Sequence, residues 1–119
     1  MDSKKTLPDQ FYVSITGLKP KSFLAYFAFV RHAIPCSNQA RQAEGILFFA
    51  TKTINGIQHT LTVWESKERM KNYLYSGAHL AAIKVFKKIA TGKTFGFESK
   101  QIPTWDEVHK LWIEKGIEY

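Results

Sequence analysis

Residues 46–64 read Ile-Leu-Phe-Phe-Ala-Thr-Lys-Thr-Ile-Asn-Gly-Ile-Gln-His-Thr-Leu-Thr-Val-Trp. Two stretches rich in β-branched and aromatic residues flank the dipeptide Asn55-Gly56. A two-residue type I′ turn needs a positive φ at both central residues, which asparagine and glycine supply most readily. The stretch therefore predicts a β-hairpin with strands over 46–54 and 57–64.

The chain before the hairpin predicts one strand and a helical region. Residues 10–17 are largely β-branched and aromatic and end at a glycine, which is typical of a strand. Over 22–34 the apolar residues recur at three- and four-residue steps, as on one side of a helix. Pro35 is expected to end or kink this helix. A second, short helical piece is predicted over 36–43.

The chain after the hairpin predicts two consecutive helices. Ser66 is a suitable N-cap for a helix over 67–75, because its hydroxyl can accept a hydrogen bond from the first turn. Ser76-Gly77 then interrupts the helical pattern. A second helix is expected over 78–90.

A weaker strand and a final helix complete the pattern. Gly92 is expected just past the end of the preceding helix, and residues 93–99 predict the strand. Thr104 and Glu107 have the spacing of a capping box. Gly116 is expected to end the helix that they begin.

The order of these elements is β-α-β-β-α-β followed by a helix, which is the ferredoxin-like split βαβ pattern. The chain has 119 residues, of which 45% are hydrophobic, so it can bury one core. We therefore expect a single ferredoxin-like α+β domain over 1–119. The lone cysteine, Cys36, excludes an internal disulfide and fits a reducing compartment.

Hydropathy predicts a soluble, cytoplasmic protein without a membrane partner. The longest apolar run is the eight residues from Phe23 to Val30, whereas a membrane-spanning helix needs about 20. The polar stretch Met1 to Lys5 is followed by no apolar run of signal-peptide length.

The formal net charge is +7, which raises the question of nucleic acid as a partner. The lysines are spread along the chain, and the densest group, Lys84 to Lys88, lies where the helix dipole favours cations. Zinc-finger, RNA-binding-sheet and helix-turn-helix patterns are all absent from the sequence. We therefore expect a mild attraction for anionic ligands rather than specific nucleic-acid binding.

The predicted strands carry large apolar residues on both faces. On the first strand Phe11, Val13 and Ile15 point one way while Tyr12 points the other. One face is expected to lie under the helices, and the other needs a cover, because large apolar patches are rare on monomers. A homodimer that pairs the same face of two copies is the simplest solution. The alternative is that the C-terminal helix folds over that face.

The run Thr60-Leu61-Thr62-Val63-Trp64-Glu65-Ser66, followed by Met70, Tyr73 and Ser76-Gly77-Ala78-His79, resembles the dimeric α+β barrel superfamily. This superfamily includes antibiotic-biosynthesis and haem-degrading monooxygenases. The motif is most similar to an uncharacterised branch that also resembles spheroidene monooxygenase. The topology resembles the superfamily over 10–99, and the motif covers only 60–84. The resemblance implies a pocket between the sheet and the helices, with walls from the first helix and residues 73–83.

The resemblance leaves two cofactor states open, none or haem. Haem-degrading members use an asparagine on the first strand, a tryptophan on the following helix and a histidine on the next. Here the first strand has no asparagine, and Tyr73 and Ile83 occupy the other two positions. The sequence therefore departs from the haem-degrading pattern.

Four residues are candidates for catalysis. His79 is the first. It is four residues before Ile83, so the two share one side of the predicted helix, and a histidine there suits general acid–base chemistry or haem ligation. Trp64 is expected to form an aromatic wall for a planar ligand, Tyr73 to supply a hydroxyl, and Arg41 to supply a cation for a carboxylate or enolate-like oxygen. The alternative is structural: a local hydrogen bond for His79 and core packing for Trp64 and Tyr73.

Residues on two helices are predicted to line the ligand pocket, namely Phe27, Arg31, His32 and Ile83. For Arg31 and His32 the alternative is a solvated position. His59 is expected to face outward or into the dimer, and His109 lies on the last helix. Neither has a histidine or cysteine at ligand spacing, so no metal site is expected.

Three functions stay open at this point. The first function is that of a monooxygenase-like enzyme that oxidises a hydrophobic or aromatic small molecule. The second function is binding of such a molecule, or of haem, without chemistry. The third is a structural dimer without a cavity. Phosphate-loop, nucleophile-elbow and dinucleotide motifs are absent, which excludes kinase, serine-hydrolase and dinucleotide-dehydrogenase functions.

Overall fold

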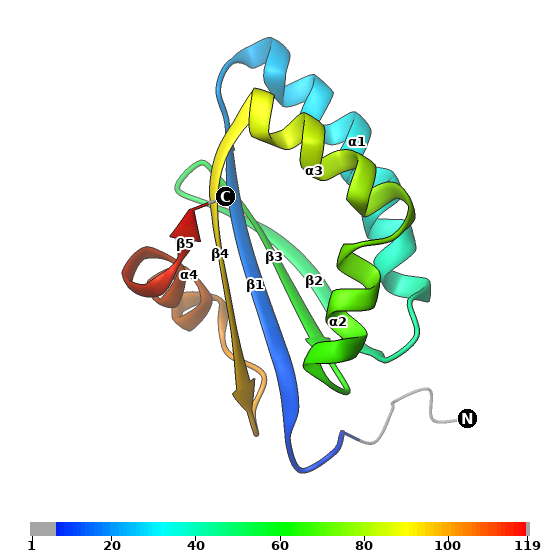
Figure 1. The fold of residues 1–119 in the computed structure, drawn as a ribbon. Helices are drawn as coiled ribbons and strands as arrows, with labels where there is room; N and C mark the ends of the chain where they lie inside the picture. The colour runs from blue at the N-terminus through cyan, green and yellow to red at the C-terminus, as the bar shows by residue number, and fades with distance from the viewer. Residues whose placement is uncertain (1–6, 119) are drawn as a thin grey trace, which may run out of the picture.

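The computed structural model describes residues 7–118, apart from the side chain of Ala78. An antiparallel sheet in the order β2-β3-β1-β4-β5 forms the centre of the molecule. The fold is α+β and ferredoxin-like with an added C-terminal helix, as the order of sequence signals predicts. The elements are β1 (Phe11–Pro20), α1 (Phe23–Gln42), β2 (Ile46–Ile54), β3 (Ile57–Trp64), α2 (Lys67–Leu74), α3 (Gly77–Ile89), β4 (Ala90–Ser99), α4 (Trp105–Lys115) and β5 (Ile117–Glu118) (Figure 1).

The predicted hairpin is present with the expected bounds. Asn55 and Gly56 have φ values of 51° and 78°, as a type I′ turn requires. Ile54 pairs with Ile57 across the turn, and β2 and β3 remain paired to Trp64. The predicted N-cap at Ser66 and the predicted capping box before α4 are also present.

Pro35 lies inside α1, so the predicted end of the helix at this residue is wrong, and the short helix expected over 36–43 is part of α1. Proline removes one backbone N–H and its intrahelical hydrogen bond, but tertiary packing can hold a helix together across that loss. The packing is visible beyond Pro35, where Cys36 and Ala40 are buried. The prediction for Gly92 is also wrong, because α3 ends at Ile89 and β4 begins immediately at Ala90.

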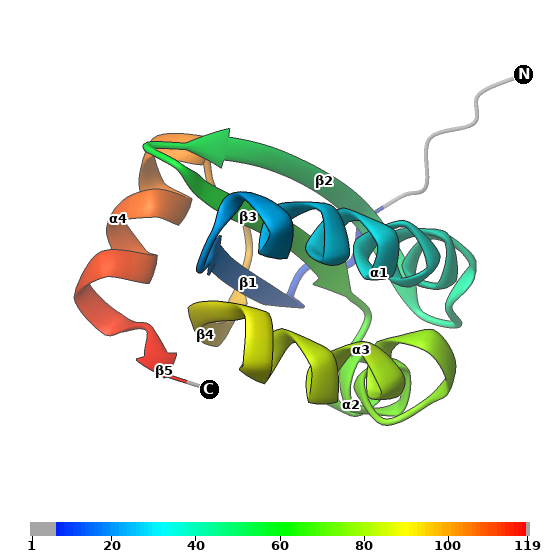
Figure 2. The same cartoon turned by 90° about the horizontal axis from the view of Figure 1, so that it is seen from above.

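The helices lie on both sides of the sheet. Figure 2 shows α1 and α3 on one side and α4 on the other. The face under α4 carries Phe11, Val13 and Ile15 from β1 and residues from β3, all buried together with Val108 of α4. No helix among the described residues is long and apolar enough to cross a membrane.

The second face of the sheet is therefore covered within one chain. The sequence left two covers open for it, a second copy or the C-terminal helix, and α4 occupies the position. Val108 is 0% exposed at the centre of the contact. Pairing of two copies through this face would need α4 to move away, so the proposed reason for a homodimer does not apply to this face.

The face under α1 and α3 has hydrophobic clusters at its two ends. One contains Tyr12, Ile46 and Trp64, and the other contains Leu18 with residues of α1 and β4. Between them the strands present small hydroxyl residues to the helices: Ser14, Thr16, Thr60, Thr62 and Thr94. All except Thr62 are only partly buried. The centre of this face is thus polar, and the aromatic candidates gather at one end of it.

Candidate functional site

Three of the four predicted catalytic side chains lie side by side. The ring centroids of Trp64 and Tyr73 are 5.2 Å apart, and those of Tyr73 and His79 are 4.7 Å apart. Trp64 is the last residue of β3, Tyr73 lies near the end of α2, and His79 lies in the first turn of α3. Two short helices thus bring residues from three elements into one aromatic row.

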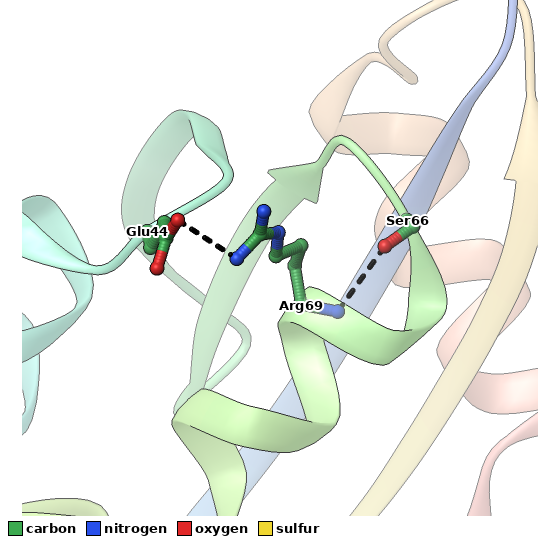
Figure 3. Close-up of polar contacts among 3 residues, drawn as sticks. All are labelled: Glu44, Ser66 and Arg69. Atoms are coloured by element: carbon green, nitrogen blue, oxygen red, sulfur yellow. Dashed lines mark hydrogen bonds and ion pairs between the residues drawn. The ribbon is translucent and has the colours of Figure 1, made fainter.

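The start of α2 is held against the loop before β2. The Ser66 hydroxyl accepts a hydrogen bond from the Arg69 N–H at 3.2 Å, and the Arg69 guanidinium lies 2.9 Å from the Glu44 carboxylate (Figure 3). Gly45 has a φ of 88°, and a Cβ there would come 2.6 Å from Arg69 Cγ. The ion pair is exposed and contributes little energy by itself. The close approach to Gly45 fixes where α2 begins.

The hydrogen bond of His79 assigns its tautomer. Its Nδ1 lies 3.2 Å from the carbonyl oxygen of Leu74, and a carbonyl can only accept, so Nδ1 carries the proton. Nε2 therefore holds the free lone pair, and no described residue gives it a hydrogen bond. Burial lowers the pKa of His79 from its ordinary value, which favours the neutral imidazole. The local hydrogen bond also matches the structural alternative that the sequence left open.

Trp64 leaves a buried donor without a partner. Its side chain is 0% exposed and packs with Tyr12 and Ile46. Among the buried side-chain polar atoms of the described residues, its indole Nε1 is the one that makes no hydrogen bond. A buried N–H without an acceptor is costly, and such a group is a candidate donor to a bound water or ligand.

Tyr73 and Gln39 connect this row to α1. The Tyr73 hydroxyl donates to the carbonyl oxygen of Cys36 at 3.2 Å. The Gln39 amide donates to the Ser76 carbonyl at 2.9 Å, and its oxygen accepts from the backbone N–H of His79 at 2.9 Å. Sequence reasoning missed Gln39, because a polar residue on a helix carries no signal of a partner 40 positions away.

Arg41 lies apart from the aromatic row. Its guanidinium carbon is 5.0 Å from the centre of the Phe49 ring on β2, which is a cation–π arrangement. No contact among the described residues joins Arg41 to His79. The four predicted catalytic residues are therefore not brought together as one set.

The residues predicted to line the pocket have mixed positions. Phe27 is 56% exposed and packs edge-on against Phe23. Arg31 is exposed, whereas His32 and Ile83 are partly buried. The ring centroids of His32 on α1 and Phe86 on α3 are 6.4 Å apart.

Two histidines far apart in sequence meet under α4. His59 is 1% exposed, so the expectation that it faces outward or into a dimer is wrong. Its Nδ1 lies 3.1 Å from the Thr16 carbonyl, and its Nε2 lies 2.8 Å from His109 Nδ1. Within residues 7–118 no three metal-ligating side chains gather at one point.

The surroundings of His79 do not fit a haem group. An axial ligand needs a flat, open slot next to its free nitrogen. Here the imidazole packs against Tyr73, and Gln39 ties the same segment to α1. Two surface hollows lie at other positions, one beside Trp112 and one beside His109. We therefore propose no role for haem in this chain.

Solved structures share this arrangement of sheet and helices. SnoaB, a cofactor-independent oxygenase from Streptomyces nogalater, has a TM-score of 0.65 and 11% identity, over 79% of this chain and 96% of that chain. A candidate antibiotic-biosynthesis monooxygenase from Deinococcus radiodurans has a TM-score of 0.65 and 18% identity, over 77% and 96%. Another from Nitrosomonas europaea has a TM-score of 0.67 and 11% identity, over 82% and 96%.

The chain shares the ferredoxin-like α+β fold of these structures. At these identities the likeness shows the fold of the chain and not its activity. No protein-family model matches the sequence, and the comparison with curated proteins found no relative.

Proposed function

We propose that this chain oxidises a hydrophobic aromatic small molecule with molecular oxygen and without a cofactor, with His79 as the base. The observation that carries the proposal is the unprotonated, unpartnered Nε2 of His79 in an aromatic row. Its support is the hydrogen bond from Nδ1 to Leu74, which assigns the tautomer. SnoaB, which shares the fold, is a cofactor-independent oxygenase.

The proposed chemistry begins with proton transfer from an acidic CH₂ group of the substrate to His79 Nε2. The resulting carbanion is electron-rich, so it reduces oxygen and combines with it to form a hydroperoxide. Loss of water then leaves a carbonyl group. The balance is one CH₂ and one O₂ converted to one C=O and one H₂O, with all electrons coming from the substrate. Histidine suits the first step because its pKa lies near neutral pH.

The neighbouring residues have roles that follow from their atoms. The Tyr73 ring packs between Trp64 and His79 and would hold the imidazole in position. The Trp64 indole N–H would donate to a substrate oxygen that gains negative charge. Arg41 remains a prediction for the same charge, and it would have to leave Phe49 to act there.

Oxygen uptake tests this proposal. The protein is incubated with a panel of polycyclic aromatic ketones that carry an acidic CH₂ group, and an oxygen electrode and product absorbance follow the reaction. His79→Ala is expected to lose at least about 100-fold in rate, since general base catalysis contributes roughly 10²–10⁴-fold. Leu80→Ala, at an exposed position on the same helix, is the control. Full activity of His79→Ala would remove the proposed role.

A second candidate function is binding of the same class of molecule without chemistry. The unpartnered Trp64 N–H supports it, because that donor needs an acceptor whether or not a reaction follows. Binding by wild-type protein, detected as quenching of tryptophan fluorescence, without oxygen uptake would favour this function. Retention of binding in His79→Ala would agree with it.

A homodimer is a separate proposal, and its support now comes from α1. Phe23, Phe27 and Ile34 lie on one side of this helix and are 77%, 56% and 57% exposed. Contiguous exposed apolar side chains are typical of protein contacts. Light scattering at micromolar concentration should give twice the chain mass, and Phe27→Asp should give the single mass. A wild-type monomer would refute the proposal. Leu80→Asp, an exposed apolar position on α3, is the control.

A further inference from the structure

A hollow of about 490 Å³ lies on the α4 side of the sheet, away from the aromatic row. Its lining includes four lysines, one carboxylate and one indole ring: Lys19, Lys21, Lys87, Lys93, Glu118 and Trp112. The volume is within the range of small-molecule sites. Neither the aromatic row nor the proposed oxidation uses any of these residues.

The hollow exists because α4 covers only part of its sheet face. Trp112 lies across Gly17, where a Cβ would come 2.4 Å from the indole nitrogen. The indole N–H donates to the Lys93 carbonyl at 3.0 Å, which fixes the ring. Beyond Trp112 the end of β1 and the start of β4 have no helix above them on this side.

The strand register brings two of the lysines to this opening. Gly17 pairs with Lys93, and Lys19 pairs with Thr91. Residues two apart on a strand point to the same face, so Lys19 and Lys93 share the face on which Trp112 lies. Lys21 follows the end of β1, and its backbone N–H donates to the Ile89 carbonyl at 2.8 Å. Lys87 lies in the last turn of α3.

The charges in the hollow are unbalanced. The lining residues carry four ammonium groups and one carboxylate, that of Glu118, and within residues 7–118 none of the four lysines forms an ion pair. The Lys93 ammonium lies 5.2 Å from the centre of the Trp112 ring. Like charges that converge on a concave, partly apolar surface raise the local concentration of anions.

We propose that this hollow binds a small ligand with two or more negative charges of the phosphate class. Lysine donates to phosphate oxygens as a point charge, and four lysines around one hollow supply donors for more than one phosphate group. Trp112 forms the apolar wall for the uncharged part of the ligand. The ligand is a small molecule rather than a nucleic-acid strand, because the lysines surround a hollow instead of following a line along the surface.

The test uses inorganic pyrophosphate as the probe and the full-length chain, at constant ionic strength. Calorimetry and tryptophan fluorescence follow the titration. Wild-type protein is expected to bind one pyrophosphate per chain, saturably. The double variant Lys19→Gln/Lys87→Gln should bind at least about tenfold more weakly, because it removes two of the four charged donors that line the hollow.

The matched control is Lys67→Gln/Lys71→Gln, which removes the same two charges from exposed positions on α2. It should bind within about twofold of wild type, because pairs away from the hollow act only through screened, long-range charge. Equal weakening in both double variants, or no saturable binding in wild type at millimolar pyrophosphate, would overturn the proposal. A single-stranded oligonucleotide that binds more tightly with length, and is weakened equally by both pairs, would overturn it as well.

Discussion

His59 on β3 and His109 on α4 are hydrogen-bonded, with 2.8 Å between Nε2 of His59 and Nδ1 of His109. The Thr16 carbonyl accepts from His59 Nδ1–H, so His59 Nε2 must accept from His109 Nδ1–H. His109 Nε2 can then accept from the Asn55 amide at 3.3 Å. His59 Nε2 can accept only while the His59 imidazole is neutral, and the chain of bonds joins α4 to the sheet.

We predict that acid destabilises the fold through His59. Burial and His109 lower the pKa of His59, so the unfolded chain takes up a proton at a higher pH than the folded chain does. Stability is therefore fully present above the ordinary histidine pKa of about 6.5 and falls as the pH falls below it. Urea unfolding between pH 8 and pH 5 measures this slope.

The same measurement on His59→Gln should give a smaller slope. A residual slope is expected, because His79 also has a lowered pKa and contributes with the same sign. A free energy of unfolding that stays constant from pH 7 to pH 5 would contradict the interpretation.

We predict that Val108→Ala destabilises the protein by about 2 kcal/mol, because it removes two methyl groups from the contact between α4 and the sheet. Val108 is 0% exposed among buried residues of β1 and β3. Ile113→Ala, at a 54% exposed position on the same helix, should change stability by less than about 0.5 kcal/mol. Thermal or urea unfolding compares them, and equal effects would mean that α4 is not packed on the sheet.

We predict that Gly45→Ala is more destabilising than Gly56→Ala. Both glycines have a positive φ, which costs an alanine roughly 1–2 kcal/mol. A Cβ at Gly45 would also press on Arg69, whereas nothing lies within 4 Å of a Cβ at Gly56. The difference in free energy of unfolding isolates the contact with α2. If the two variants are equal, the Arg69 side chain moves aside without cost.

We predict that Gln39→Ala loosens the junction between α2 and α3. It removes hydrogen bonds to Ser76 and to the His79 backbone, and should destabilise by about 1–2 kcal/mol. Hydrogen exchange should rise over residues 74–80 more than elsewhere. Gln42→Ala, at an exposed position near the end of the same helix, is the control. Unchanged exchange at 74–80 would show that the junction holds without Gln39.

Local signals predicted much of this fold. Asn55-Gly56 predicts the hairpin because only a few residues adopt its turn. Thr104 and Glu107 predict the start of α4 because the capping box is a contact within four residues. Pro35 predicts a helix end that is not present, because the packing that keeps α1 continuous involves residues distant in sequence.

The contacts of the candidate sites needed the structure. Tyr73 and His79 lie close in sequence, and a turn brings them together. His59 and His109 are 50 positions apart, so neither suggests the other without the sheet topology. Whether α4 or a second copy covers the sheet depends on the direction that the chain takes between β4 and α4. The amino-acid pattern of that segment does not predict this direction. The four lysines beside Trp112 come from three segments and show no local cluster in the sequence.

The position of α4 also has a consequence for synthesis on the ribosome. The strands β1, β3 and β4 are complete once Ser99 has been made, but Trp105–Lys115 must follow before their apolar face is sheltered. Until those residues emerge, a nascent chain exposes Phe11, Val13 and Ile15 to solvent or to a chaperone. Translation speed over the last helix thus governs how long the growing polypeptide is prone to aggregation.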